Sequence, residues 1–160
     1  MKNYHLEKKF YEFRDLRELL RTSAEKYADR TAFVTKIKNK KEVNYINTTY
    51  AKLFETMGYL GTALIEKGYK DKRIAVIGEN SYNWCLAYFA AGCGVGTVVP
   101  LDKGLQKEEL ESCLNRSSAE VVFYDKKQAG VIERIAQEKT TGLSLLVAMD
   151  FQPERGVTMM

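Results

Sequence analysis

Histidine is almost absent from this sequence. The single histidine among 160 residues is His5, close to the N-terminus. A histidine-based metal site, or a Ser/His or Cys/His catalytic pair, would therefore need a partner from another chain or domain. Cysteine is also scarce, and Cys85, Cys93 and Cys113 form no CxxC pair. Three such cysteines argue against a disulfide framework or a zinc site and indicate a reducing, cytoplasmic compartment.

The sequence also lacks a marked excess of one charge and a clear membrane-spanning run. Lys and Arg total 25 and Asp and Glu total 21, and the net charge of +4 is too small to indicate a nucleic-acid partner. Residues 1–13 are too charged to form a secretory signal. Residues 84–101 are uncharged, but their glycines and Pro100 favour a buried helix, a turn and a strand over a span. We therefore expect a soluble protein without a membrane span.

Glycine-rich phosphate loops of the known nucleotide-binding types are missing as well. The sequence contains no GxxxxGK[ST], and no GxGxxG follows the buried run that ends at Gly78. The glycines at residues 92–96 follow a helix pattern and precede a strand, whereas a phosphate needs a helix N-terminus after the loop. We interpret them as a helix C-cap and a tight turn. The residue pattern alone thus predicts no catalytic residue.

Apolar runs alternate with amphipathic helix patterns along most of the chain. The length fits one domain, and 45% hydrophobic residues are enough for a packed core. Continuously apolar runs predict strands at residues 73–78, 97–100, 120–124 and 143–149. Helices are predicted at residues 49–67, 81–92, 107–115 and 127–138. This alternation predicts an α/β fold with a Rossmann-like, mostly parallel sheet and helices on both faces.

A helix and a β-hairpin are expected ahead of the sheet. Asp15 and Glu18 form an N-cap pair for a helix that ends near Tyr27. Residues 31–37 and 42–46 flank a lysine-rich turn at 38–41, which predicts a hairpin packed apart from the sheet centre.

The two ends of the chain differ in structural signal. We assign residues 1–149 to a single α/β subdomain. Residues 150–160 carry no structural pattern, and we interpret them as a tail leading into the missing remainder of a longer protein. The alternative is a stand-alone, non-catalytic α/β binding or scaffold module.

Five segments, taken in order, resemble motifs of the adenylate-forming (AMP-binding) enzymes. The entry segment at 16–33 and the "TY-x-x-L" helix start within 44–64 come first. Residues 73–84 (RIAVIGENSYNW) resemble the strand followed by "EN-x-x-x-W". Residues 91–102 (AGCGVGTVVPLD) and 117–125 (SSAEVVFYD) resemble "G-x-G-x-x-V-P-L" and "S-x-A-x-x-V-F". The series is most similar to the long-chain fatty acid–CoA ligase branch.

This resemblance implies ATP-dependent activation of a carboxylate. Family members form an acyl-adenylate with release of pyrophosphate and then transfer the acyl group to the thiol of coenzyme A. ATP, magnesium and coenzyme A would serve the parent enzyme, whose substrate is a small-molecule carboxylate. A peptide-synthetase adenylation domain and an aryl-CoA ligase are alternatives within the superfamily.

Several functional parts of the family have no match in this sequence. These are the Ser/Thr/Gly-rich phosphate loop with its lysine, the adenine-binding segment, the ribose-binding aspartate and the small C-terminal domain with the catalytic lysine. We therefore interpret the chain as the truncated N-terminal part of such an enzyme. Alone, it is expected to be inactive, to bind none of these ligands tightly and to have no metal site.

Two loops carry the residues that the resemblance places nearest to a ligand. In relatives, the coenzyme A nucleotide lies near the loops after the "VVP" and "VVFYD" strands. The matching residues here are Leu101, Asp102, Lys103, Lys126 and Lys127. Lysines suit phosphates, whereas Asp102 disfavours an anion. Surface-loop lysines without a ligand are the alternative interpretation.

The resemblance also bears on association. In an intact relative, this subdomain packs against the remainder of the same enzyme. The predicted helices at 49–67 and 81–92 are rich in apolar residues, so we expect them to be exposed in the isolated chain. Self-association, most simply as a two-fold dimer, is the expected result.

Overall fold

A five-stranded parallel sheet forms the centre of the molecule. In the computed structural model, which describes residues 12–38, 42–153 and 156–159, the strand order is β4-β3-β5-β6-β7. The strands are β3 (Arg73–Ile77), β4 (Thr97–Leu101), β5 (Val121–Tyr124), β6 (Leu145–Ala148) and β7 (Val157–Thr158). All neighbouring pairs in this sheet are parallel, so the carboxyl ends of its strands meet at one edge. The four predicted strands are confirmed.

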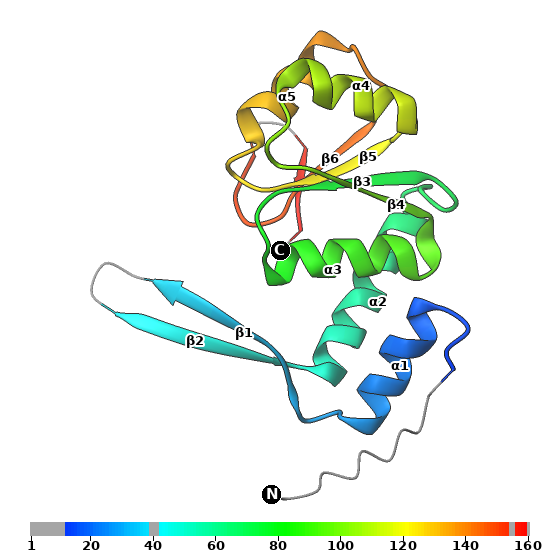
Figure 1. Ribbon diagram of the computed structural model, residues 1–160, viewed down its shortest axis with the longest axis vertical. Helices are drawn as coiled ribbons and strands as arrows, with labels where there is room; N and C mark the ends of the chain where they lie inside the picture. Colours follow the sequence, from blue (N-terminus) through cyan, green and yellow to red (C-terminus); the bar gives the residue numbers. More distant parts are fainter. Residues whose placement is uncertain (1–11, 39–41, 154–155, 160) are drawn as a thin grey trace, which may run out of the picture.

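Helices cover both faces of this sheet (Figure 1). They are α2 (Tyr50–Glu66), α3 (Tyr82–Ala90), α4 (Lys107–Ser117) and α5 (Ala129–Glu138). Leu64 of α2 and Ala87 of α3 are buried in the cluster on one face, and Leu110 of α4 and Ile132 of α5 in the cluster on the other. The predicted α/β fold is confirmed. Its strands are continuously apolar because both faces of the sheet are covered.

Helix ends lie close to their sequence signals. The side chains of Asp15, Thr49 and Ser81 accept hydrogen bonds from first-turn backbone N–H groups of α1 (Leu16–Lys26), α2 and α3. Such N–H groups have no partner within the helix, and each cap stabilises it by about 1 kcal/mol. Gly68, with φ of +87°, follows the last turn of α2.

The glycine-rich segment after α3 forms a tight turn, as the sequence analysis predicted. Helix α3 ends at Ala90, two residues before the predicted end, and a kinked turn, η1 (Ala91–Val95), follows it, in which Cys93 and Gly94 leave the helical conformation. Gly94 has a φ of +123°, a conformation that side chains other than glycine rarely adopt. At Gly96, a Cβ would lie 2.0 Å from the Lys72 carbonyl oxygen, so the chain can pass there only without a side chain.

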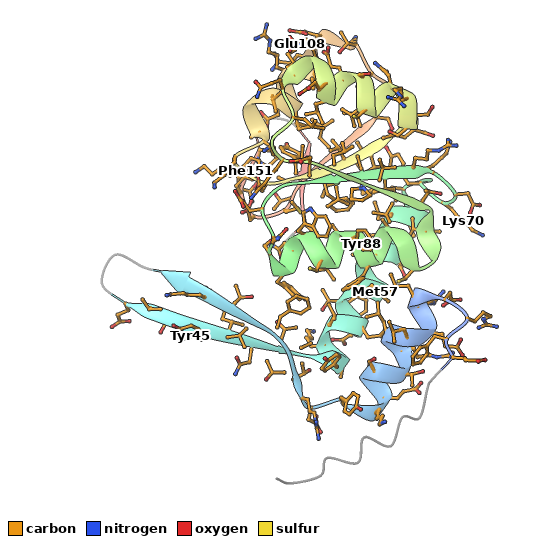
Figure 2. The ribbon with its side chains drawn as sticks, viewed as in Figure 1. Tyr45, Met57, Lys70, Tyr88, Glu108 and Phe151 are labelled. Carbon is orange, nitrogen blue, oxygen red and sulfur yellow. The ribbon has the colours of Figure 1, made fainter. Side chains whose placement is uncertain are left out.

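The hairpin stands apart from the parallel sheet, which confirms the prediction (Figure 1). It consists of β1 (Thr31–Lys38) and β2 (Val43–Thr49), paired antiparallel. Turn residues 39–41 lie outside the described residues, as does His5. Large hydrophobic side chains are exposed along both strands, and Figure 2 shows Tyr45 on the projecting β2. They are Val34, Ile37, Val43, Tyr45 and Ile46.

Helices α2 and α3 are less exposed than the sequence analysis predicted. Leu53 and Met57 of α2 are buried together with Leu86 of α3, because the two helices pack against each other. Among the described residues, only Tyr59 and Ile65 of these helices are exposed large hydrophobics. The main exposed apolar surface therefore lies on the hairpin.

The last residues of the chain contribute to the fold, although the sequence showed no structural pattern in residues 150–160. Val157 of β7 pairs with Val147 of β6 at the edge of the sheet. The Phe151 ring meets the Tyr124 ring edge-on, with centroids 5.5 Å apart, and Met159 packs against the buried core. A two-residue strand is too short to give a periodic pattern, so only the neighbouring strand reveals it.

Candidate functional site

The predicted ligand residues lie at the carboxyl edge of the parallel sheet. Strands β4 and β5 pair with opposite sides of β3, and the connecting helices α3 and α4 lie on opposite faces. Open parallel sheets bind ligands outside their carboxyl ends, where successive connections leave for opposite faces. Three loops meet here, at residues 78–81, 102–106 and 125–128, and we call them the edge loops.

The structure brings two of the five predicted residues together. The Nζ atoms of Lys103 and Lys127, from different edge loops, both bind the carboxylate of Glu79. The Lys127 contact measures 2.9 Å. Lys126 also lies in this region, and its backbone N–H donates to the Asp150 carboxylate over 3.3 Å.

The other two residues have structural roles. Leu101 is the last residue of β4 and packs against the core cluster under α4 and α5, so it offers no polar group to a ligand. The Asp102 carboxylate accepts a hydrogen bond of 2.7 Å from the Gly104 backbone N–H and shapes its own loop.

Glu79 is the residue that sequence reasoning missed. It lies in the EN-x-x-x-W segment, which carries the family resemblance but from which no ligand residue was predicted. Its position directly after a buried parallel strand was the available signal, because that position faces the ligand edge. Hydrogen bonds from Lys103 and then Lys127 lower the pKa of Glu79 from 4.5 to about 2.

The buried Asp125 side chain links two edge loops through hydrogen bonds. The side chain is only 6% exposed, and its carboxylate accepts hydrogen bonds from the Glu79 N–H at 2.7 Å and the Gln128 N–H at 3.1 Å. Gly78, with φ of +148°, makes room for it, since a Cβ there would lie 2.8 Å from the Asp125 Oδ2. The buried carboxylate thus positions the backbone that carries Glu79.

A titration of Glu79 is expected to show a midpoint near pH 2. Because the folded-state pKa is below the unfolded value, the stabilisation from the ion pairs is fully present above about pH 4.5 and is lost as the pH falls through about 2. NMR of the side-chain carboxyl carbon measures this midpoint. Replacing both Lys103 and Lys127 with alanine should raise it toward 4.5, and an unchanged midpoint in that variant would contradict the assignment.

Two open hollows lie on the surface near the sheet. One, of about 520 Å³, borders Lys126 and is lined by residues of α5 together with Phe151 and Gln152. The other, of about 300 Å³, is apolar and lies between α2 and strands β5 to β7, around Leu60, Phe123 and Val147. Only the first adjoins the predicted ligand residues.

Other reactive features are few in residues 12–38, 42–153 and 156–159. These residues contain no group of three His, Cys, Asp or Glu side chains that could hold a metal ion. None of their helices has the length and apolarity needed to cross a membrane. Burial raises the pKa of the Cys93 thiol to about 11, which keeps it protonated and unreactive.

Curated relatives of the chain are ligases of fatty acids and coenzyme A. Long-chain-fatty-acid–CoA ligase 5 of Rattus norvegicus is 30% identical over 107 residues, covering 64% of this chain and 16% of the relative. Long chain acyl-CoA synthetase 4 of Arabidopsis thaliana is 24% identical over 133 residues, covering 82% and 20%. The chain therefore spans about a sixth to a fifth of the length of these relatives.

Solved structures share the fold. A long-chain-fatty-acid-CoA ligase from Archaeoglobus fulgidus superposes with a TM-score of 0.75 at 20% identity, covering 89% of this chain and 29% of that one. A luciferase-like enzyme from Zophobas morio superposes with a TM-score of 0.73 at 19% identity, covering 92% and 35%. The family model described as "AMP-binding enzyme" matches residues 20–157. The match runs from α1 to the start of β7, and the chain belongs to the AMP-binding enzyme family.

Proposed function

We propose that this chain forms the N-terminal part of an ATP-dependent, AMP-forming acyl-CoA ligase that activates a long-chain fatty acid. The observation that carries the proposal is the family match over residues 20–157, together with relatives named as long-chain fatty acid–CoA ligases. The reaction would join the carboxylate to the AMP moiety with release of pyrophosphate and then pass the acyl group to coenzyme A.

The residues of this chain fit only part of that reaction. They contain no phosphate-cradling loop of the Walker or dinucleotide type, and residues 12–38, 42–153 and 156–159 contain no group of three His, Cys, Asp or Glu side chains that could hold a metal ion. We therefore assign the adenylation step to other parts of the parent enzyme. The edge loops fit the phosphates of coenzyme A better, because Lys103, Lys126 and Lys127 supply ammonium groups there. The hollow of about 520 Å³ beside Lys126 has a volume typical of small-molecule sites.

Residues 1–160 alone are expected to catalyse no ATP–pyrophosphate exchange with a long-chain fatty acid. The family's phosphate loop and catalytic lysine have no match in this sequence. Radiolabelled pyrophosphate incorporation into ATP measures the reaction, with an intact family ligase as the positive control. Exchange by material free of host ligase would contradict this assignment of roles.

We also propose that the protein works in a reducing compartment such as the cytoplasm, which keeps its three free cysteines reduced.

We further propose that the chain self-associates through the exposed hydrophobic side chains of the hairpin. Tyr45 on β2 and Tyr59 on α2 are matched in exposure, at 62% and 65%. In size-exclusion chromatography with light scattering, Tyr45→Ser should shift the chain to monomer while Tyr59→Ser should not. A wild-type monomer at high concentration would instead favour the self-contained binding module.

A further inference from the structure

Three edge loops are held together by one carboxylate between two ammonium groups. Glu79 lies in the loop after β3, Lys103 in the loop after β4 and Lys127 in the loop after β5. Both lysines direct Nζ at Glu79, one at each carboxylate oxygen. The three side chains are 44 to 73% exposed, so a ligand from solvent can reach them.

The other carboxylates of this edge bind backbone groups. Asp102 accepts from the Gly104 N–H, Asp125 from the Glu79 and Gln128 N–H groups, and Asp150 from the Lys126 N–H. Glu79 is thus the carboxylate that pairs with the lysine side chains in the described part of the edge. It places a negative group at the position where two lysines converge.

We propose that Glu79 is a specificity-determining residue that occupies the anion position between Lys103 and Lys127. A phosphate needs the same two ammonium groups, so it binds only by displacing the Glu79 carboxylate. A dianionic phosphate monoester gains more from two ammonium groups than a singly charged group does. The site therefore selects ligands that end in a phosphate monoester over ligands that carry a carboxylate or a phosphodiester. The assignment of that phosphate to coenzyme A rests on the proposed function.

The Glu79 carboxylate also competes with a bound phosphate for the two lysines. The Glu79 N–H is held by the buried Asp125, so the carboxylate stays close to both lysines even when a ligand has displaced it. The affinity of the wild-type edge for a free phosphate is consequently reduced, because the pairing already present must be broken first. Removing the charge of Glu79 frees both ammonium groups, while the hydrogen bond from the residue 79 backbone N–H to Asp125 still links the loops after β3 and β5.

The test is a calorimetric titration of adenosine 3′,5′-bisphosphate into the 160-residue chain. Glu79→Gln is expected to bind about three- to tenfold more tightly than wild type, the gain available from releasing exposed ion pairs. Glu55→Gln is the matched control. The Glu55 carboxylate pairs with a lysine elsewhere on the surface, Lys52, and its side chain is 46% exposed, against 44% for that of Glu79. The control should keep the wild-type affinity.

A triple variant separates the anion position from a general charge effect. Adding Lys103→Ala and Lys127→Ala to Glu79→Gln should abolish the gain. The proposal would be overturned if wild type and Glu79→Gln bound the bisphosphate with equal affinity, or if neither bound it measurably. A gain in affinity that survives the loss of both lysines would overturn it as well. The ligase assignment fails separately, if a longer polypeptide containing these residues makes no acyl-CoA from a fatty acid.

Discussion

Gly96→Ala is expected to lower the free energy of unfolding by about 3 kcal/mol or more, the upper range for overpacking a tight site. The new Cβ would lie 2.0 Å from the Lys72 carbonyl oxygen and 3.1 Å from the Lys72 N and C atoms. That carbonyl accepts a 3.0 Å hydrogen bond from the Thr97 N–H, so moving it away disrupts the start of β4. Urea unfolding followed by far-UV circular dichroism measures the loss.

Gly130→Ala is the matched control for this variant. Gly130 lies in α5 and has no atom within 4 Å of a built Cβ. Alanine favours a helix over glycine by about 1 kcal/mol, so this variant should be as stable as wild type or more so. Gly96→Ala with wild-type stability would mean that the turn between η1 and β4 can relax and that close passage is not required there.

Asp125→Ala is expected to destabilise the chain by about 2 kcal/mol, since it leaves the partly buried N–H groups of Glu79 and Gln128 without their charged acceptor. It also removes the link between the loops after β3 and β5. The Lys127 contact with Glu79 should loosen with it, and the pKa of Glu79 should rise from about 2 toward its ordinary value.

Two companion variants make this result specific. Asp102→Ala removes an exposed carboxylate that serves only its own turn, and its effect should stay below about 0.5 kcal/mol. Asp125→Asn keeps an acceptor oxygen and should recover part of the lost stability. Equal effects from Asp102→Ala and Asp125→Ala in thermal and urea unfolding would rule out a special role for the buried carboxylate.

Local interactions explain why the sequence alone predicted the elements of this fold. A helix cap such as Asp15 binds an N–H three residues away, and a buried strand such as 120–124 shows its burial in its own composition. Each of these signals lies within a few residues of the structure that it produces. The α/β class followed from their alternation, because strands covered on both faces need helices between them.

Contacts between distant residues decided the candidate site and the edge of the sheet. Glu79 pairs with Lys103 and Lys127, which lie 24 and 48 residues further along the chain. The sequence around Glu79 therefore does not indicate either partner. Strand β7 forms because β6 offers it hydrogen-bond partners. The hydrophobic side chains of the hairpin are exposed because no other described element packs over them. Sequence patterns placed Lys103 and Lys127 on two loops. Only the parallel order of β4, β3 and β5 brought those loops to one carboxylate, because strand order is set by packing across the whole sheet.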